Sequence, residues 1–133
     1  MTGIAPHGMT FELQVGDLAA ARAFYTELFG RPPELEPDEG LLEWAVVPGQ
    51  ETWLQVAGVV TPQPLRARLR FAVRDLPAAR EALLASGVEV SPAGSVPGVV
   101  AWCDLDDPWG NRLGLYEVLT AGGDRAESPT STA

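Results

Sequence analysis

The first clear pattern in the chain is an alternation of polar and apolar residues over residues 10–15. A period of two residues is typical of a strand that buries one face. Asp17 follows and is placed to cap a helix over residues 18–29, where apolar side chains recur at helical spacing. Gly30 is suited to end this helix, because glycine adopts the left-handed conformation at low cost. The apolar segments within residues 41–57 then predict a β-hairpin.

The same succession returns in the second half of the chain. Residues 68–73 alternate with the same phase, Asp75 precedes a second helical stretch that ends near Gly87, and apolar segments within residues 99–119 predict a second hairpin. The sequence Val-x-Asp-Leu, with an arginine four residues after the leucine, occurs in both halves. Trp44 and Trp102 coincide in the same superposition of the two halves. The repeat predicts an α+β fold made of two βαβββ modules.

The repeat also sets the domain organisation. A short strand before each hairpin, at residues 33–35 and 88–90, would complete each module. The C-terminal end is small, polar and aperiodic, which predicts disorder. The expected parts are an N-terminal arm at 1–8, a first βαβββ module at 9–60, a linker at 61–65, a second βαβββ module at 66–119 and a disordered tail at 120–133.

Composition narrows the class of protein and of partner. The chain is 46% hydrophobic and 20% charged, which is ordinary for a folded domain. No apolar stretch approaches the roughly 20 residues needed to cross a bilayer, and the N-terminus lacks the pattern of a signal peptide. A net charge of −9 and the absence of lysine argue against a nucleic-acid partner. Cys103 has no second cysteine to pair with, which favours a reducing, cytoplasmic location.

Two motifs carry a resemblance to a known family. Residues 15–30 combine Val-x-Asp-Leu with Phe-Tyr and Leu-x-Gly, and residues 107–111 read Asp-Pro-Trp-Gly-Asn before a final strand. These motifs resemble the glyoxalase/bleomycin-resistance/extradiol-dioxygenase superfamily, also called vicinal oxygen chelate proteins. The resemblance covers about residues 9–119. It implies curled mixed sheets around a concave pocket, with the helices on the outside.

Catalytic members of that superfamily hold a divalent metal ion with inward-facing side chains from four strands. The resemblance places the four ligand positions on Thr10, Gln55, Arg68 and Gly114. Two neutral oxygens, a guanidinium and a missing side chain make a poor ligand set for a divalent cation. We therefore expect no metal and no other cofactor. His7 is the only histidine, and it is expected at the surface of the arm.

Strand parity predicts which side chains share the pocket face. They form a polar, arginine-rich and aromatic surface, which suits an aromatic or anionic small molecule. The same face would also suit a solvated sheet, with Glu12 paired to an arginine, or an interface between subunits. The predicted ligand-binding residues are Thr10, Glu12, Trp53, Gln55, Arg68, Arg70 and Tyr116, and Gln14 and Arg112 share their phase.

Three classes of function remain open from the sequence. The first is a metal-independent protein that sequesters or senses a small molecule, of the glyoxalase/bleomycin-resistance type. The second is a lyase, isomerase or dioxygenase of the same superfamily with an atypical active site; its catalytic residues are not identified, and Glu43 is a partner for Glu12 only if its strand has the right phase. The third is a fold-only subunit or interaction module. Open sheet edges further predict a homodimer.

Overall fold

The computed structural model describes residues 3–120, so the predicted tail lies outside the described residues except for Thr120. Two βαβββ modules follow one another, which confirms the α+β class. The chain divides into two compact units: unit 1 is Met1–Leu65 with Trp109–Asn111, and unit 2 is Arg66–Pro108 with Arg112–Ala133. The elements are β1 (Gly8–Val15), α1 (Leu18–Phe29), β2 (Leu35–Asp38), β3 (Leu41–Ala45), β4 (Glu51–Gly58), β5 (Leu69–Ala72), α2 (Leu76–Ala85), β6 (Gly94–Val96), β7 (Val100–Asp106) and β8 (Arg112–Val118).

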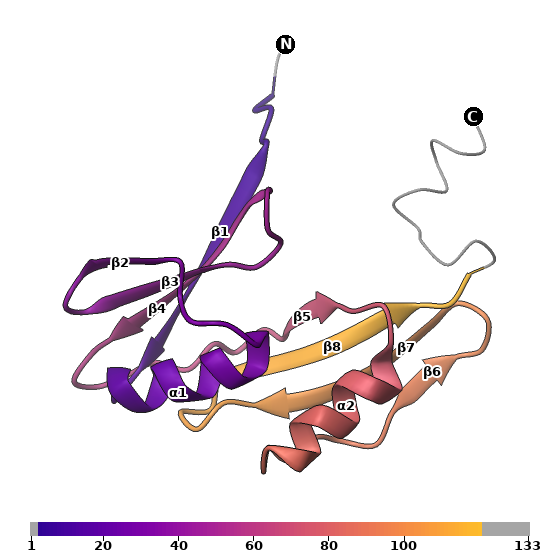
Figure 1. Cartoon of the computed structure of the whole chain (residues 1–133). Helices are drawn as coiled ribbons and strands as arrows, with labels where there is room; N and C mark the ends of the chain where they lie inside the picture. Colours follow the sequence, from indigo (N-terminus) through magenta and orange to yellow (C-terminus); the bar gives the residue numbers. More distant parts are fainter. Residues whose placement is uncertain (1–2, 121–133) are drawn as a thin grey trace. The chain divides into compact units, whose positions relative to one another are not determined.

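The first module forms a four-stranded sheet in the order β1-β4-β3-β2, with β1 parallel to β4 and the other neighbours antiparallel. α1 lies against one face of this sheet (Figure 1). Leu13 and Val15 of β1, and Leu54 and Val56 of β4, are buried on that face. The alternate side chains are exposed or half-buried. We call the face of each sheet that its own helix does not cover the open face.

Both helices begin at the predicted aspartates. The Asp17 carboxylate accepts a hydrogen bond from Ala20 N at 3.1 Å, and the Asp75 carboxylate accepts one from Ala78 N at 3.0 Å. Gly30 ends α1 in the left-handed conformation, with φ at 72°. These caps satisfy backbone groups that have no partner inside the helix. The cap residues therefore fix where each helix starts on its sheet.

Aromatic rings hold α1 to the first sheet. The Tyr25 ring centre lies 5.8 Å from the Trp44 ring and 6.2 Å from the Phe29 ring. Tyr25 and Trp44 are fully buried, and Trp44 Nε1 donates to Arg31 O at 2.9 Å. Buried aromatic side chains contribute much of the hydrophobic stabilisation of a small core, provided that their polar atoms are bonded. This cluster is the core of unit 1.

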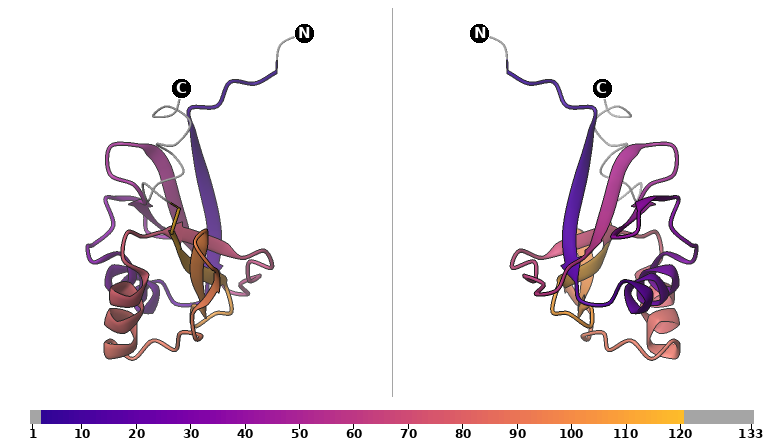
Figure 2. Two further views of the ribbon diagram at one scale, coloured as in Figure 1. Left: turned by 90° about the vertical axis from the view of Figure 1, so that its right-hand side faces the viewer. Right: turned by 90° about the vertical axis from the view of Figure 1, so that its left-hand side faces the viewer.

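The second module repeats the arrangement with smaller side chains. Its sheet has the order β5-β8-β7-β6, again with the first strand parallel to its neighbour. α2 lies on one face of this sheet (Figure 2). Leu76 and Leu83 of α2 are buried there, as are Cys103, Leu113 and Leu115 of the central strands.

The short strand predicted at residues 88–90 is wrong. The third strand of the second module lies later in the chain, at Gly94–Val96. Gly87 has φ at 86°, and the N–H of Val88 donates to Leu83 O at 3.0 Å. This pattern is a Schellman cap, in which the residues just after the helix satisfy its last carbonyls. The backbone of Val88 is therefore committed to ending α2 and does not pair with a strand.

The last three residues of the Asp-Pro-Trp-Gly-Asn motif, Trp109–Asn111, belong to unit 1. Asn111 is fully buried. Its Nδ2 donates to Gln14 O at 2.9 Å, and its Oδ1 accepts from Leu65 N at 2.7 Å. A buried amide needs such partners, because an unbonded one would lose its hydration without compensation. The asparagine therefore serves the packing of unit 1.

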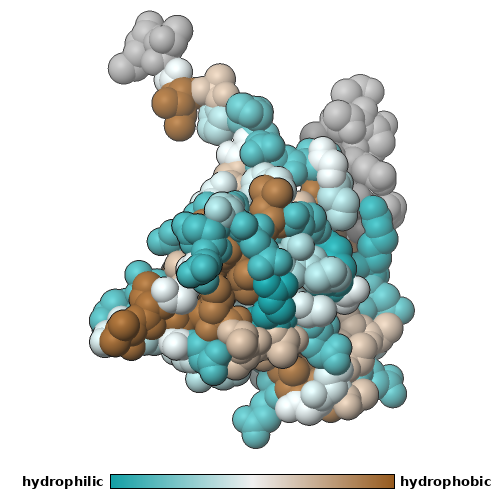
Figure 3. All heavy atoms as spheres, turned by 60° about the vertical axis from the view of Figure 1, so that its left-hand side comes forward, coloured by the Kyte–Doolittle hydropathy of each residue, from teal (hydrophilic) through white to brown (hydrophobic). Residues whose placement is uncertain are grey.

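Several large apolar side chains remain exposed. They include Met9, Leu35 and Val47 in unit 1, and Val96 and Val99 in unit 2. Figure 3 shows apolar patches set among hydrophilic residues on one side of the molecule. Contiguous apolar patches of this kind often mark interaction surfaces. Neither described helix has the length and apolar character that crossing a bilayer requires.

Candidate functional site

The open face of the first sheet carries four of the seven predicted site residues. Thr10 lies opposite Trp53, and Glu12 lies opposite Gln55. Their side chains are exposed or half-buried, whereas Leu13, Leu54 and Val56 at alternate positions of the same strands are buried, as strand parity predicts. The phase of β3 is also settled, because Glu43 faces this side and accepts a hydrogen bond from Gln55 Nε2 at 3.3 Å.

The other three predicted residues belong to unit 2. Arg70 and Tyr116 lie on the open face of the second sheet, and Arg68 comes just before β5. The Arg68 side chain is only 16% exposed. Its Nη1 donates to Leu113 O and, at 3.3 Å, to Leu105 O. Arg68 is therefore already engaged with the backbone of two strands.

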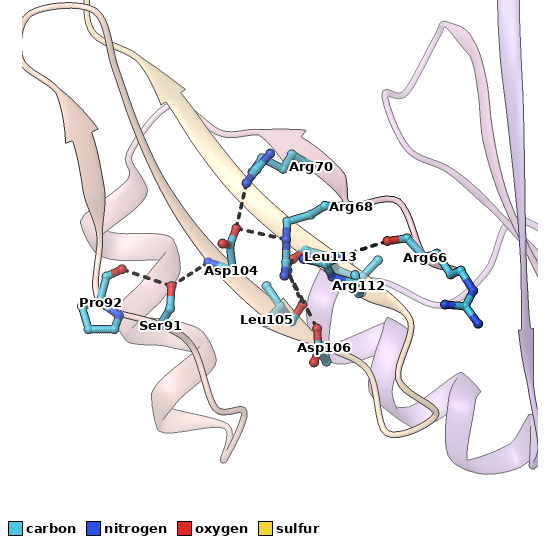
Figure 4. A network of polar contacts seen from close by, with 10 residues as sticks. All are labelled: Arg66, Arg68, Arg70, Ser91, Pro92, Asp104, Leu105, Asp106, Arg112 and Leu113. Atoms are coloured by element: carbon cyan, nitrogen blue, oxygen red, sulfur yellow. Dashed lines mark hydrogen bonds and ion pairs between the residues drawn. The ribbon is translucent and has the colours of Figure 1, made fainter. Parts of the chain in front are cut away.

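Two aspartates of β7 complete this network (Figure 4). Asp104 Oδ1 lies 3.6 Å from Arg68 Nε and 3.3 Å from Arg70 Nη2, and Asp106 Oδ1 lies 3.8 Å from Arg68 Nη1. Arg112 Nη1 donates to Arg66 O at 3.1 Å. Two arginines thus meet two carboxylates, whereas Arg112 bonds only a backbone carbonyl in this network.

A cleft adjoins Arg70 on the open face of the second sheet. It has a volume of about 470 Å³ and is lined by Arg70, Val100, Trp102 and Tyr116. Trp102 and Tyr116 lie opposite each other in the β7–β8 pair. The indole packs on the backbone of Gly94, where an added Cβ would come within 2.7 Å of a ring carbon. The glycine therefore allows a large aromatic surface to lie close to β6.

The position of the predicted fourth metal ligand is occupied by other groups. A Cβ on Gly114 would lie 2.9 Å from Arg70 Cγ and 3.0 Å from both Asp104 Oδ1 and Cys103 O. The missing side chain is thus replaced by the Arg70–Asp104 ion pair, which crosses the strand at this point. A guanidinium repels a cation strongly at short range in a partly buried site. The residues of unit 2 do not fit a metal ion.

The metal-ligand positions of unit 1 do not fit a metal either. Thr10 offers a neutral hydroxyl, and the amide of Gln55 is bonded to Glu43. Within residues 3–120, no three His, Cys, Asp or Glu side chains come together in a way that could hold a metal ion. Divalent cations favour carboxylate oxygen or imidazole nitrogen ligands. The residues at these positions of the first module therefore do not fit a divalent metal ion.

Two further residues singled out by the sequence are not part of the cleft lining. Cys103 is fully buried, and burial raises the pKa of its thiol, so the thiolate needed for nucleophilic attack is disfavoured. His7 is exposed and lies along a shallow groove with Thr10 and Glu51. Neither residue has the surroundings of a catalytic group.

Sequence reasoning missed Trp102, Val100 and Asp104. Superposing the two halves matched Trp102 with Trp44, which is buried, but the two tryptophans face opposite sides of their sheets. Trp44 lies opposite Leu54, and its structural counterpart is the buried Cys103. The run from Val99 to Cys103 is apolar at every position, so no alternation reveals the phase.

Comparisons with known proteins agree with this fold. The family model of the glyoxalase-like domain matches residues 9–116. A glyoxalase/bleomycin resistance protein from Catenulispora acidiphila DSM 44928 is similar with a TM-score of 0.71 and 26% identity, over 85% of this chain and 99% of that one. The antibiotic binding protein TnmS3 from Streptomyces sp. CB03234 has a TM-score of 0.71 and 27% identity, over 86% and 97%. A comparison with curated proteins gives no match.

Proposed function

The chain belongs to the glyoxalase-like domain family, within the glyoxalase/bleomycin-resistance superfamily, and from this premise we propose that it binds a small molecule without a metal ion. Its role is to sequester or sense that molecule in the cytoplasm. The observation that carries the proposal is the cleft of Arg70, Trp102 and Tyr116. The similar protein TnmS3 is an antibiotic binding protein, which supports a binding role in this branch of the fold.

The lining of the cleft indicates an aromatic, anionic ligand. The two aromatic side chains offer flat apolar surface for stacking. The Arg70 side chain is 41% exposed, and its bond to Asp104 is long, at 3.3 Å. Its remaining N–H groups are therefore available to a carboxylate, which a guanidinium binds as a fork. Arg68, by contrast, is held by two carbonyls and two carboxylates, so Arg70 supplies most of the recognition.

A thermal-shift screen tests this function. We expect 2-naphthoate to raise the melting temperature more than 2-naphthamide does, because only the acid engages Arg70. Arg70→Gln should abolish this difference, and Trp102→Leu should weaken the binding of both compounds by about tenfold or more. Arg112→Gln, on the same face but outside the cleft, is the matched control and should bind like the parent.

Metal dependence is tested in the same assay. EDTA should change neither the melting temperature nor the response to 2-naphthoate. An equal response to acid and amide in the parent would refute the anionic ligand. A response abolished by EDTA would refute metal independence.

We further propose that the protein is a homodimer. Both sheets end in unpaired edge strands, and exposed apolar residues such as Leu35 on β2 and Val96 on β6 lie on two of them. Edge strands of this kind are commonly covered by pairing or by a second subunit. Sedimentation equilibrium at micromolar concentration should give twice the chain mass. A single-chain mass throughout the concentration range would contradict the proposal.

A further inference from the structure

A second and larger cleft lies on the helix side of unit 2, away from the open face. It has a volume of about 870 Å³ and runs between one flank of α2 and the sheet. Its apolar lining comes from Pro77 and Leu84 of α2, Ala101 of β7 and Leu119 after β8. Its size lies within the range of small-molecule sites, which is about 300–1,000 Å³.

Comparison of the two modules explains why this cleft exists. In the first module, Leu42 of β3 lies opposite Val56 of β4, and both side chains are buried beneath α1. The counterparts in the second module are Ala101 of β7 and Glu117 of β8, which lie opposite each other and are only half-buried. The leucine and the valine that fill this space in the first module are thus replaced in the second by an alanine and a glutamate. The alanine offers only a methyl group, and the glutamate carboxylate is hydrogen-bonded to another group. The helix side of the second sheet is left incompletely filled.

The carboxylates near the cleft are mostly committed to the helix. Glu117 Oε1 accepts a hydrogen bond from Leu76 N at 2.7 Å, and Asp75 accepts one from Ala78 N. Pro77 has no N–H to offer. The start of α2 is therefore already capped and is not itself an anion site. Recognition of a ligand falls to the arginines in the lining.

Two arginines line the cleft: Arg74 is exposed, whereas Arg80 is the more buried of the two. It is half-buried, its Nε donates to Ser91 O at 2.8 Å, and it forms no ion pair with any of residues 3–120. Its counterpart in the first module, Arg22, forms an ion pair with Glu36 of β2. The equivalent strand β6 reads Gly-Ser-Val and carries no acid. The second module thus has the equivalent arginine without an equivalent carboxylate on its third strand.

We propose that this cleft is a second binding site, which takes an amphipathic monocarboxylate. The carboxylate binds the Nη groups of Arg80 and so replaces the counterion that Glu36 supplies in the first module. The apolar chain or ring lies over Ala101 and Leu119, in the space that Leu42 and Val56 fill in the first module. The site is independent of the open-face cleft, because no residue lines both.

NMR titration of the full chain with octanoate and with octanamide tests the proposal. Octanoate should shift the NMR signals of the Ala93 and Ala101 backbone amides in a saturable way. The affinity for octanamide should be lower by about tenfold or more. Arg80→Gln should weaken octanoate binding to the level of the amide. Ala101→Leu, which restores the leucine of the first module, should block both compounds. Arg22→Gln and Arg70→Gln are the matched controls and should bind octanoate like the parent.

Several results of this titration would overturn the second site. Equal binding of acid and amide, shifts confined to the Trp102 indole, or Ala101→Leu binding as well as the parent would each overturn it. Absence of saturable shifts with both octanoate and 4-phenylbutyrate would overturn it as well. If Arg80→Gln does not fold, the proposal is tested by Ala101→Leu, which leaves Arg80 unchanged, and by the comparison of octanoate with octanamide in the parent protein. Loss of octanoate binding in Arg70→Gln would show that octanoate binds in the open-face cleft, and this result would refute the second site.

Discussion

Replacing Gly114 by glutamate should destabilise the protein by about 2–3 kcal/mol and should not create a metal site. The glutamate would place a carboxylate at the fourth metal-ligand position that the family resemblance implies. Its Cβ alone would come within 3.0 Å of the Cys103 carbonyl, Asp104 Oδ1 and Arg70 Cγ. Two of these neighbours form an ion pair and the third is backbone, so the crowding cannot be relieved by a flexible chain end. The new carboxylate would also compete with Asp104 for Arg70.

Urea denaturation measures the loss, and titration with Ni²⁺ and Zn²⁺ measures any gain. Gly114→Ala separates crowding from charge, because it introduces the Cβ without a carboxylate. Gly40→Ala is the matched control: a Cβ there has only an ordinary contact, 3.5 Å from Asp38 Oδ1, and stability should change little. Stabilisation of Gly114→Glu by either metal would contradict the conclusion that the residues at the ligand positions do not fit a divalent metal ion.

The architecture was predictable because its signals are local. Asp17, Gly30 and Asp75 cap helices through contacts within a few residues, and alternation in β1 needs only neighbours along the chain. The third strand of the second module was misplaced because Val88 bonds to Leu83, and hydrophobic pattern does not distinguish a helix cap from a short strand.

The site was predictable only in part, because its key contacts join distant segments. Strand parity correctly grouped Arg70 with the open face, but it could not show that Asp104 would lie beside it. Asp106 is likewise not among the predicted site residues, although its Oδ1 lies 3.8 Å from Arg68 Nη1. The orientation of Trp102 depends on the register of β7 against β8, which an uninterrupted apolar run does not specify.

The partners of Arg68 change what its removal should do. The sequence places Arg68 among the ligand-binding residues, whereas the structure places the guanidinium among four acceptors of its own chain. Leu113 and Leu105 are buried, so their carbonyls would lose a charged donor with little access to water. Asp104 would also lose one of its two cationic neighbours.

We therefore expect Arg68→Met to lower the free energy of unfolding by about 2–4 kcal/mol, because hydrogen bonds to charged groups contribute roughly 1.5–3 kcal/mol and the acceptors left behind are partly buried. Methionine retains much of the apolar stem, so the loss reports mainly on the guanidinium. Arg70→Met is the matched control: its half-exposed ion pair should contribute at most about 1 kcal/mol. Urea denaturation of both variants decides. If Arg68→Met is as stable as Arg70→Met but does not bind 2-naphthoate, Arg68 is instead a ligand-binding residue, as the sequence predicts.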